Sequence, residues 1–301
     1  MRWVQSNIGA FGGNPRNVTA FGESAGGANV YSLLRLREAR GLFHKAIIQS
    51  GSMRGDRTLT AQAAERSART FFDSLGAGSA TAMRQLPWAR IVAAQAGWPD
   101  GSYFAPVMDG EVEPAPVPLL IGTNRDEWRM YLPDDAERAL DEGLRQFATA
   151  QIAPARAYLE RISADPRTRA DRLTSGQYFL CPARDVAAES VRAGNPTFVY
   201  LFTRVRPGPH DLGAYHGAEI PYVFGTTDDW LATTPIDEHL SRTMSAYWVQ
   251  FATHGNPNGP GLIAWPRFAP DAGPFELGDR IGALPPDLHE LCRYLDPSAG
   301  A

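Results

Sequence analysis

A glycine-flanked serine lies between a short apolar segment and a run of small residues near the start of the 301-residue chain. The apolar segment covers residues 18–21, and the turn after it, residues 22–26, reads Gly-Glu-Ser-Ala-Gly. A Gly-x-Ser-x-Gly turn from a strand into a helix presents the serine hydroxyl at the edge of a parallel sheet. The turn pattern alone matches by chance in glycine-rich chains, so its flanking strand and helix give it weight. We therefore predict that Ser24 is a nucleophile.

The residue after this serine opens the predicted helix over residues 25–36. Its backbone N–H and the positive end of the helix face the place where negative charge forms when Ser24 attacks a carbonyl carbon. We therefore predict that Ala25 supplies a donor to an oxyanion hole.

Apolar strand segments alternate with helical segments along the rest of the chain. This alternation predicts an α/β fold with a mostly parallel sheet and helices on both faces. We expect one α/β domain over residues 1–301, with helical insertions. The predicted strands are 17–22, 45–51, 116–128 (ending in a polar loop) and 196–204, and the predicted helices are 3–11, 25–36, 60–75, 79–95, 134–163, 182–193 and 237–254.

Charge and cysteine content limit the partners of the chain. A net charge of −4 over the whole sequence predicts neither nucleic acid nor anionic lipid as a partner. No Cys/His spacing indicates a metal site, and no apolar run approaches the length of a membrane span. Of the two cysteines, we expect Cys181, in the apolar run YFLCPA, to be a buried free thiol, although a single bridge to Cys292 stays open. Oligomeric state and localisation also stay open.

Two loops that follow later strands offer an acid and a base in the order serine, acid, histidine. Asp126 and Glu127 follow the strand within 116–128, and position alone does not separate them. His210 and His216 follow the strand at 196–204. His210 comes after Gly-Pro in what reads as an exposed turn, so spacing favours His216. The other histidines are predicted to be structural (His44), solvated (His239 and His289) or placed at a helix C-terminus (His254).

Six segments follow one another along the chain in this order: RWVQSNIGAFGGNPRNVTAFGESAGG, KAIIQSGS, FAPVMDG, GTNRDEW, YHGAEIPYVFG and FATHGNPN. In this order they resemble the type B carboxylesterase family, which includes bacterial para-nitrobenzyl esterases and the cholinesterases. The resemblance implies the α/β-hydrolase fold, with Ser24 as nucleophile, His216 as general base and Glu127 as the acid that orients it. It also implies that Ser50 is an accessory serine behind these residues. Trp128 is a departure, because many members have glycine after the acid.

The reaction implied by the resemblance is hydrolysis of small-molecule carboxylic esters through an acyl-enzyme, without metal or organic cofactor. Two alternatives stay open: a non-catalytic member of the same fold, and hydrolysis of amides or carbamates by the same residues. In the family, a long N-terminal portion with a His-Gly-Gly-Gly-type loop precedes the helix before the serine turn. This motif does not occur in the sequence. We therefore expect the chain to correspond to the C-terminal part of such an enzyme, without the N-terminal strands, and to be a weak esterase alone.

Overall fold

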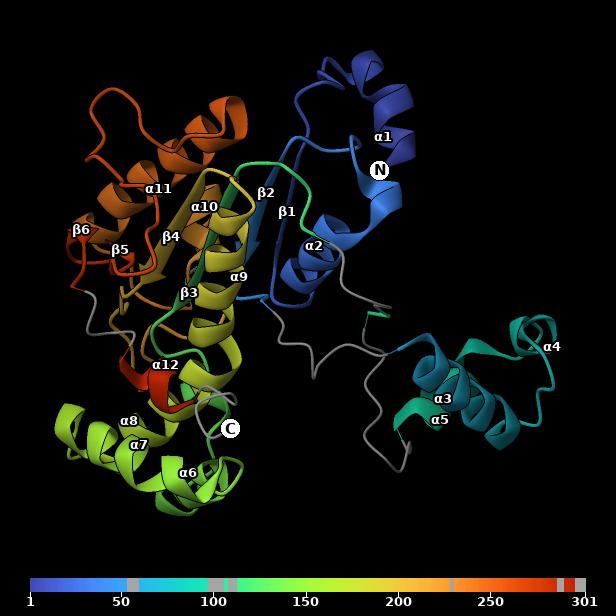
Figure 1. The fold of residues 1–301 in the computed structure, drawn as a ribbon, viewed down its shortest axis with the longest axis horizontal. Coiled ribbons are helices and arrows are strands. Elements are labelled where there is room, and N and C mark those ends of the chain that lie inside the picture. The colour runs from blue at the N-terminus through green and yellow to red at the C-terminus, as the bar shows by residue number, and fades with distance from the viewer. Residues whose placement is uncertain (53–59, 97–105, 108–112, 228–229, 286–289, 296–301) are drawn as a thin grey trace. The chain divides into compact units, whose positions relative to one another are not determined.

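The computed structural model describes residues 1–52, 60–96, 106–107, 113–227, 230–285 and 290–295 (Figure 1). The chain divides into two compact units, one made of residues 1–53 and 112–301 and the other of residues 54–111. His289 and most of the segment FAPVMDG lie outside the described residues. Ser24, Ser50, Glu127 and His216 all belong to the first unit, so this unit carries the candidate site.

Six strands in the described part of the first unit form one sheet, in the order β1-β2-β3-β4-β5-β6 (Figure 1). Strands β1 to β5 run parallel to one another, and β6 is antiparallel to β5. Four strands end at one edge and lead into the loops with the predicted site residues. The predicted mostly parallel sheet is confirmed, with strands β1 (Thr19–Glu23), β2 (Lys45–Gln49), β3 (Leu119–Asn124), β4 (Thr197–Phe202), β5 (Phe275–Leu277) and β6 (Ile281–Ala283).

Helices cover both faces of this sheet, as predicted. Successive side chains of a strand point to opposite faces of the sheet, so the side chains of Leu119 and Leu120 in β3 lie on different faces. Leu120 packs in one cluster with the apolar side chains of α11 (Pro235–His254). Leu119 instead lies beside residues of α2 (Ala25–Arg35) and α9 (Cys181–Arg192). The buried strands therefore lie between two helical layers.

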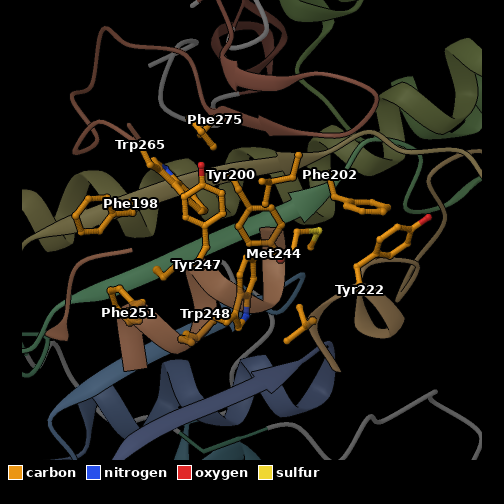
Figure 2. Packing of buried hydrophobic residues seen from close by; sticks show 14 of the residues in the cluster. Phe198, Tyr200, Phe202, Tyr222, Met244, Tyr247, Trp248, Phe251, Trp265 and Phe275 are labelled. Carbon is orange, nitrogen blue, oxygen red and sulfur yellow. The ribbon is translucent and has the colours of Figure 1, made fainter. Parts of the chain in front are cut away.

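Aromatic side chains fill the space between the sheet and α11 (Figure 2). Trp265 stacks on Phe275 with ring centroids 4.7 Å apart, and meets Tyr247 edge-on at 5.2 Å. Burying a large apolar side chain stabilises a fold by about 1.5–3 kcal/mol. Because this cluster includes residues of β2, β3, β4 and β5, it holds these strands together behind the candidate site.

A helical segment joins β3 to β4 within the first unit. It begins with η4 (Arg129–Tyr131) and α6 (Ala136–Leu144) and continues through α7 (Thr149–Ile162) and α8 (Pro166–Ser175) to a π-helical turn, η5 (Gly176–Leu180). The predicted helix over 134–163 is thus interrupted between Leu144 and Thr149. No element was predicted at α8, which begins with Pro166 after an Asp165 side chain that accepts from two backbone N–H groups.

The Cys181–Cys292 pair forms a disulfide, so the prediction of a free Cys181 thiol is wrong. The two Cα atoms lie 5.4 Å apart although 111 residues separate them in sequence. Cys181 is fully buried, as expected, and Cys292 lies on α12 (Glu290–Tyr294). Helix α12 packs against η5, where a Cβ on Gly176 would lie 2.7 Å from a Leu291 methyl carbon. This long-range packing, which residue spacing cannot reveal, joins the two cysteines.

Short helices complete the two units. The predicted helix over 3–11 is α1 (Arg2–Asn7) followed by η1 (Ile8–Phe11), with Trp3 and Phe11 in contact with each other but exposed. In the second unit, α3 (Ala61–Ser74) is followed by α4 (Ala80–Arg84) and α5 (Trp88–Ala96). The predicted helix over 79–95 divides before Pro87, because proline disfavours helical backbone in the residue preceding it. The described residues of the first unit also form the short helices η2 (Arg37–Ala39) and α10 (Ile220–Phe224).

Candidate active site

Ser24 lies in a tight turn between β1 and α2. Its backbone has φ 53° and ψ −119°, a conformation that costs a non-glycine residue about 1–3 kcal/mol. Glycines make the turn tight, because a Cβ on Gly22 would lie 2.4 Å from the backbone carbon of Gly26. The close approach of Gly27 to Gly51, after β2, likewise leaves no room for a side chain. The helix is therefore seated on the sheet edge and holds Ser24 at the carboxyl end of β1.

Glu127 follows β3 and is fully buried. One of its carboxylate oxygens, Oε1, accepts hydrogen bonds from the backbone N–H of Asn124 at 2.7 Å and from Ser50 Oγ at 2.6 Å. The other oxygen, Oε2, lies 2.6 Å from His216 Nδ1. Ser50 is reached from β2 through a backbone turn with φ 49°. Both oxygens of the buried carboxylate thus have polar partners, which satisfies its charge.

His216 joins Glu127 to Ser24. Its Nε2 lies 2.7 Å from Ser24 Oγ, and its Nδ1 faces Glu127. With a proton on Nδ1, the ring donates to Glu127 and accepts the Ser24 hydroxyl proton at Nε2. Burial disfavours the charged ring, but the hydrogen bond and negative charge of Glu127 outweigh it, so the pKa of His216 lies above its usual value. The contacts favour a ring that accepts a proton from the serine and holds it beside a carboxylate.

Aromatic rings flank His216 on the side of the helical segment. Phe179, in η5, has its ring centroid 5.1 Å from that of His216, and Tyr131 lies at 6.5 Å. Trp128 contacts both of these aromatic rings, at 6.1 Å and 5.0 Å. The tryptophan that departs from the family pattern therefore packs in the aromatic group beside the histidine.

Two further carboxylates lie near the histidine, and neither is a predicted site residue. Glu219 is fully buried and accepts from Gln49 Nε2 at 2.9 Å and Asn124 Nδ2 at 2.6 Å. Glu23, inside the serine turn, has an oxygen 3.4 Å from His216 Nε2. Burial, and then repulsion from Glu219, raises the pKa of Glu23 to about 7. Both lie in quoted motifs, Glu23 in the Gly-Glu-Ser-Ala-Gly turn and Glu219 in the segment YHGAE, three residues after His216.

The structure does not bring the alternative acid and base to Ser24. The Asp126 carboxylate is directed toward Arg125 and the backbone of the histidine loop, and His210 is exposed. His44 has a structural contact, since its Nδ1 accepts from the Val18 backbone N–H at 3.1 Å. His239 and His254 are exposed.

Ala25 is the first residue of α2 and lies directly beside Ser24. A backbone N–H in the first turn of a helix has no partner within that helix, so it is free to bind an incoming oxygen. Within the described residues, no group of three or more His, Cys, Asp or Glu side chains is arranged to hold a metal ion. None of the helices described has both the length and the apolar character needed to cross a bilayer.

Residues 1–278 match the family model described as the carboxylesterase family. The chain belongs to the carboxylesterase family. It is 32% identical to carboxylesterase 1C of Rattus norvegicus over 92% of its own length, and 30% identical to the para-nitrobenzyl esterase of Bacillus subtilis (strain 168) over 89%. A solved structure of a PNB esterase superimposes with a TM-score of 0.80 at 28% identity, covering 99% of this chain. The α/β-hydrolase fold predicted for this carboxylesterase-family chain is thereby confirmed.

The chain matches only part of the length of these relatives. This carboxylesterase-family chain spans 58% of the rat protein, 59% of the Bacillus protein and 66% of the PNB esterase structure. The activity and substrates of those longer proteins are therefore considered below as a proposal for this chain.

Proposed function

We propose that this chain carries the catalytic groups of a carboxylic-ester hydrolase, with Ser24 as nucleophile, His216 as general base and Glu127 as the orienting acid. The observation that supports it is the pair of contacts at His216, with Ser24 Oγ 2.7 Å from one ring nitrogen and Glu127 2.6 Å from the other. A serine hydroxyl becomes a competent nucleophile only when an adjacent base takes its proton. Membership of the carboxylesterase family favours an ester as the substrate.

In the proposed reaction, Ser24 Oγ attacks the ester carbonyl carbon while its proton passes to His216 Nε2. Glu127 stabilises the imidazolium that forms, since its buried carboxylate faces Nδ1. The tetrahedral intermediate collapses to an acyl-serine, and the alcohol leaves with the proton from His216. Water then loses a proton to the same nitrogen, attacks the acyl group and releases the acid, which restores the Ser24 hydroxyl.

Stabilisation of the oxyanion is assigned to the Ala25 backbone N–H. Ala25 opens an eleven-residue helix, so the positive end of the helix dipole lies at the same place. Such a donor stabilises the transition state more than the neutral carbonyl of the substrate, and the loss of one typically costs about 10² to 10³ in rate. The substrate class we propose is small-molecule carboxylic esters.

Covalent labelling tests the proposal without knowledge of the natural ester. The 301-residue chain is treated with a fluorophosphonate, and peptides are analysed by mass spectrometry. We expect one adduct, on Ser24, with p-nitrophenyl acetate hydrolysis lost in parallel. The Ser24→Ala variant, unlabelled and inactive, is the control. A folded wild-type chain that takes no label and hydrolyses no ester would contradict the proposal.

A further inference from the structure

Asp126 is a buried carboxylate for which the proposed reaction has no use. It precedes Glu127 in the sequence, yet its carboxylate contacts Arg125 and the Ala214 backbone, and only 5% of the residue is exposed. A buried charge is destabilising unless it is paired and hydrogen-bonded. Its partners therefore indicate what the carboxylate does.

The loop that carries His216 is bound to Asp126 through both backbone and side chain. The Asp126 N–H donates to the Ala214 carbonyl oxygen at 3.1 Å, and the Ala214 N–H donates to Asp126 Oδ2 at 2.8 Å. Ala214 is fully buried and lies two residues before His216. A Cβ on Gly213, whose φ is +65°, would lie 2.6 Å from Asp126 Cβ. The histidine loop thus rests directly on the Asp126 side chain.

Two arginines keep this carboxylate charged. Arg125 Nη2 lies 2.9 Å from Oδ2, and Arg172 of α8 contacts Oδ1 at 3.4 Å. Burial alone would raise the pKa of Asp126, but the two guanidinium groups and the Ala214 N–H hold it below its usual value. A carboxylate oxygen that stays ionised is a stronger acceptor for the Ala214 N–H than a neutral group.

A second contact joins the same two loops closer to solvent. Arg129 Nε donates to Asp211 Oδ1 at 3.0 Å. The Asp211 side chain is 70% exposed, so this ion pair is screened by water and salt. The Asp126 contacts are buried, and they lie nearer to His216 in the sequence. They therefore restrain the histidine more strongly than the outer ion pair does.

We propose that Asp126 is a positioning residue, whose carboxylate holds the loop over residues 213–216 so that His216 stays within hydrogen-bond reach of both Glu127 and Ser24. The kinetic part of this inference rests on the proposed function. The geometric part concerns only the placement of the His216 ring and is testable without turnover.

The first test compares Asp126→Ala with Asp126→Asn in p-nitrophenyl acetate hydrolysis. Misplacement of a catalytic group by about 1 Å costs roughly 10² in rate, so we expect kcat of the alanine variant to fall about 10²-fold with KM within about threefold. Asparagine keeps an oxygen that can accept from the Ala214 N–H, and its kcat should stay within about tenfold of wild type. Leu140→Ala, in the buried core around α6, controls for lost stability and should retain kcat in the folded fraction.

The second test is an NMR titration of the His216 ring. Glu127, Glu23 and Glu219 face this ring and favour its charged form. Both Asp126 variants remove the same charge, so a change in the His216 pKa that they share is due to the lost charge alone. We expect an additional fall in the His216 pKa only in Asp126→Ala, as the ring moves away from Glu127. The acidic limb of kcat/KM should move to lower pH in the same variant.

The outcomes separate this inference from the proposed function. A wild-type chain without esterase activity or phosphonate label contradicts the proposed function, whereas the titration still reports on His216. The same His216 pKa and the same kcat in the alanine and asparagine variants would overturn the positioning role of Asp126. Should Asp126→Ala be unfolded, Asp126→Leu, which fills the site without an acceptor, replaces it with the same expectations.

Discussion

Ser50 Oγ donates a hydrogen bond of 2.6 Å to Glu127 Oε1, the carboxylate oxygen that does not face His216. The serine, only 1% exposed, follows the strand next to the one that carries Ser24. Through this contact, β2 fixes the acid on β3, while the other carboxylate oxygen remains available to the histidine. This contact is consistent with the accessory role that the family resemblance implies for Ser50.

Replacing Ser50 with alanine should weaken turnover while leaving binding unchanged. Glu127 keeps the Asn124 N–H but loses one charge-assisted hydrogen bond, typically worth about 1.5–3 kcal/mol. We expect kcat for p-nitrophenyl acetate to fall roughly tenfold or more, with KM nearly constant. Ser52→Ala is the matched control, because Ser52 is also buried but its hydroxyl makes no hydrogen bond in the described structure. Equal kcat in the two variants would show that Ser50 does not support the acid.

Removing the proposed nucleophile should abolish activity without unfolding the chain. In Ser24→Ala we expect kcat to fall by a factor on the order of 10⁴ or more, while the circular dichroism spectrum and thermal midpoint stay close to wild type. Ser32→Ala, on the helix that follows Ser24, controls for loss of a serine hydroxyl, since Ser32 Oγ donates to the Ala28 carbonyl oxygen within that helix. Substantial esterase activity in purified Ser24→Ala would exclude the assigned nucleophile.

Substitution of the proposed acid or base should reduce activity far more than substitution of the neighbouring histidine, His210. Glu127→Gln disturbs the tautomer and orientation of His216, which in related triads costs about 10⁴ in kcat. His216→Ala removes the proton acceptor and should be at least as damaging. His210→Ala should remain within about twofold, because this side chain is exposed. Single-turnover acylation rates measured at pH 7 to 8 decide between these expectations, and a severe loss in His210→Ala would reverse the assignment.

The Asp171 carboxyl should make the chain less stable as pH rises. Burial, and then repulsion from Asp126, raises the pKa of Asp171 to about 7, against an ordinary value of 3.8. Between about pH 4 and 7 the native state holds a proton that the unfolded state has lost. This group therefore lowers the free energy of unfolding by about 1.4 kcal/mol per pH unit in that window, and the decrease ends above pH 7.

Asp171→Asn should remove this dependence. The amide oxygen can still accept from the Trp128 N–H and Ser175 Oγ, as Asp171 Oδ1 does. We expect the variant to be more stable than wild type at pH 8 and similar at pH 5, as measured by urea unfolding. Asp73→Asn, at an exposed position, controls for the loss of a carboxylate. The same difference from wild type at both pH values would contradict the raised pKa.

The disulfide should contribute measurably to stability. A bridge that closes a loop of this length restricts the unfolded chain, and removal of such a bridge typically costs about 2–5 kcal/mol. Reduction with dithiothreitol should therefore lower the thermal midpoint. The double variant Cys181→Ala/Cys292→Ala should show the lower midpoint at the outset and be insensitive to reductant. A wild-type midpoint that reductant leaves unchanged, with both thiols shown to be free, would contradict this role.

The positions of β1 to β4 were predictable because each contains a short apolar run, whereas β5 and β6, three residues each, were not predicted. The choice between Asp126 and Glu127 was not predictable, since position along the chain does not say how the backbone turns after β3. In the structure, that turn places Glu127 where it accepts a hydrogen bond from the Asn124 backbone N–H. The same turn places Asp126 against the histidine loop, where it accepts from the Ala214 N–H. The family resemblance pointed to Glu127 where periodicity left both residues open.

Features that depend on packing between distant segments escaped sequence reasoning. Helix α8 was missed because its arginine-rich segment, PRTRADRLTS, shows only a weak apolar face, although Asp165 and Pro166 form a recognisable start signal. The buried role of Glu219 depends on amide groups from β2 and β3 that lie 170 and 95 residues away in sequence. Neither contact leaves a local pattern in the chain.

The proposed catalytic residues and Ser50 follow successive strands of the sheet, with Ser24 after β1, Ser50 after β2, Glu127 after β3 and His216 after β4. The serine and the histidine are 192 residues apart and meet only when these four strands are paired in register. Forming such non-local contacts is slow, because the chain must close long loops before the contacts stabilise them. Reactivity toward a fluorophosphonate should therefore return during refolding only when these strands have paired. A covalent serine probe thus reports when the four strands have assembled.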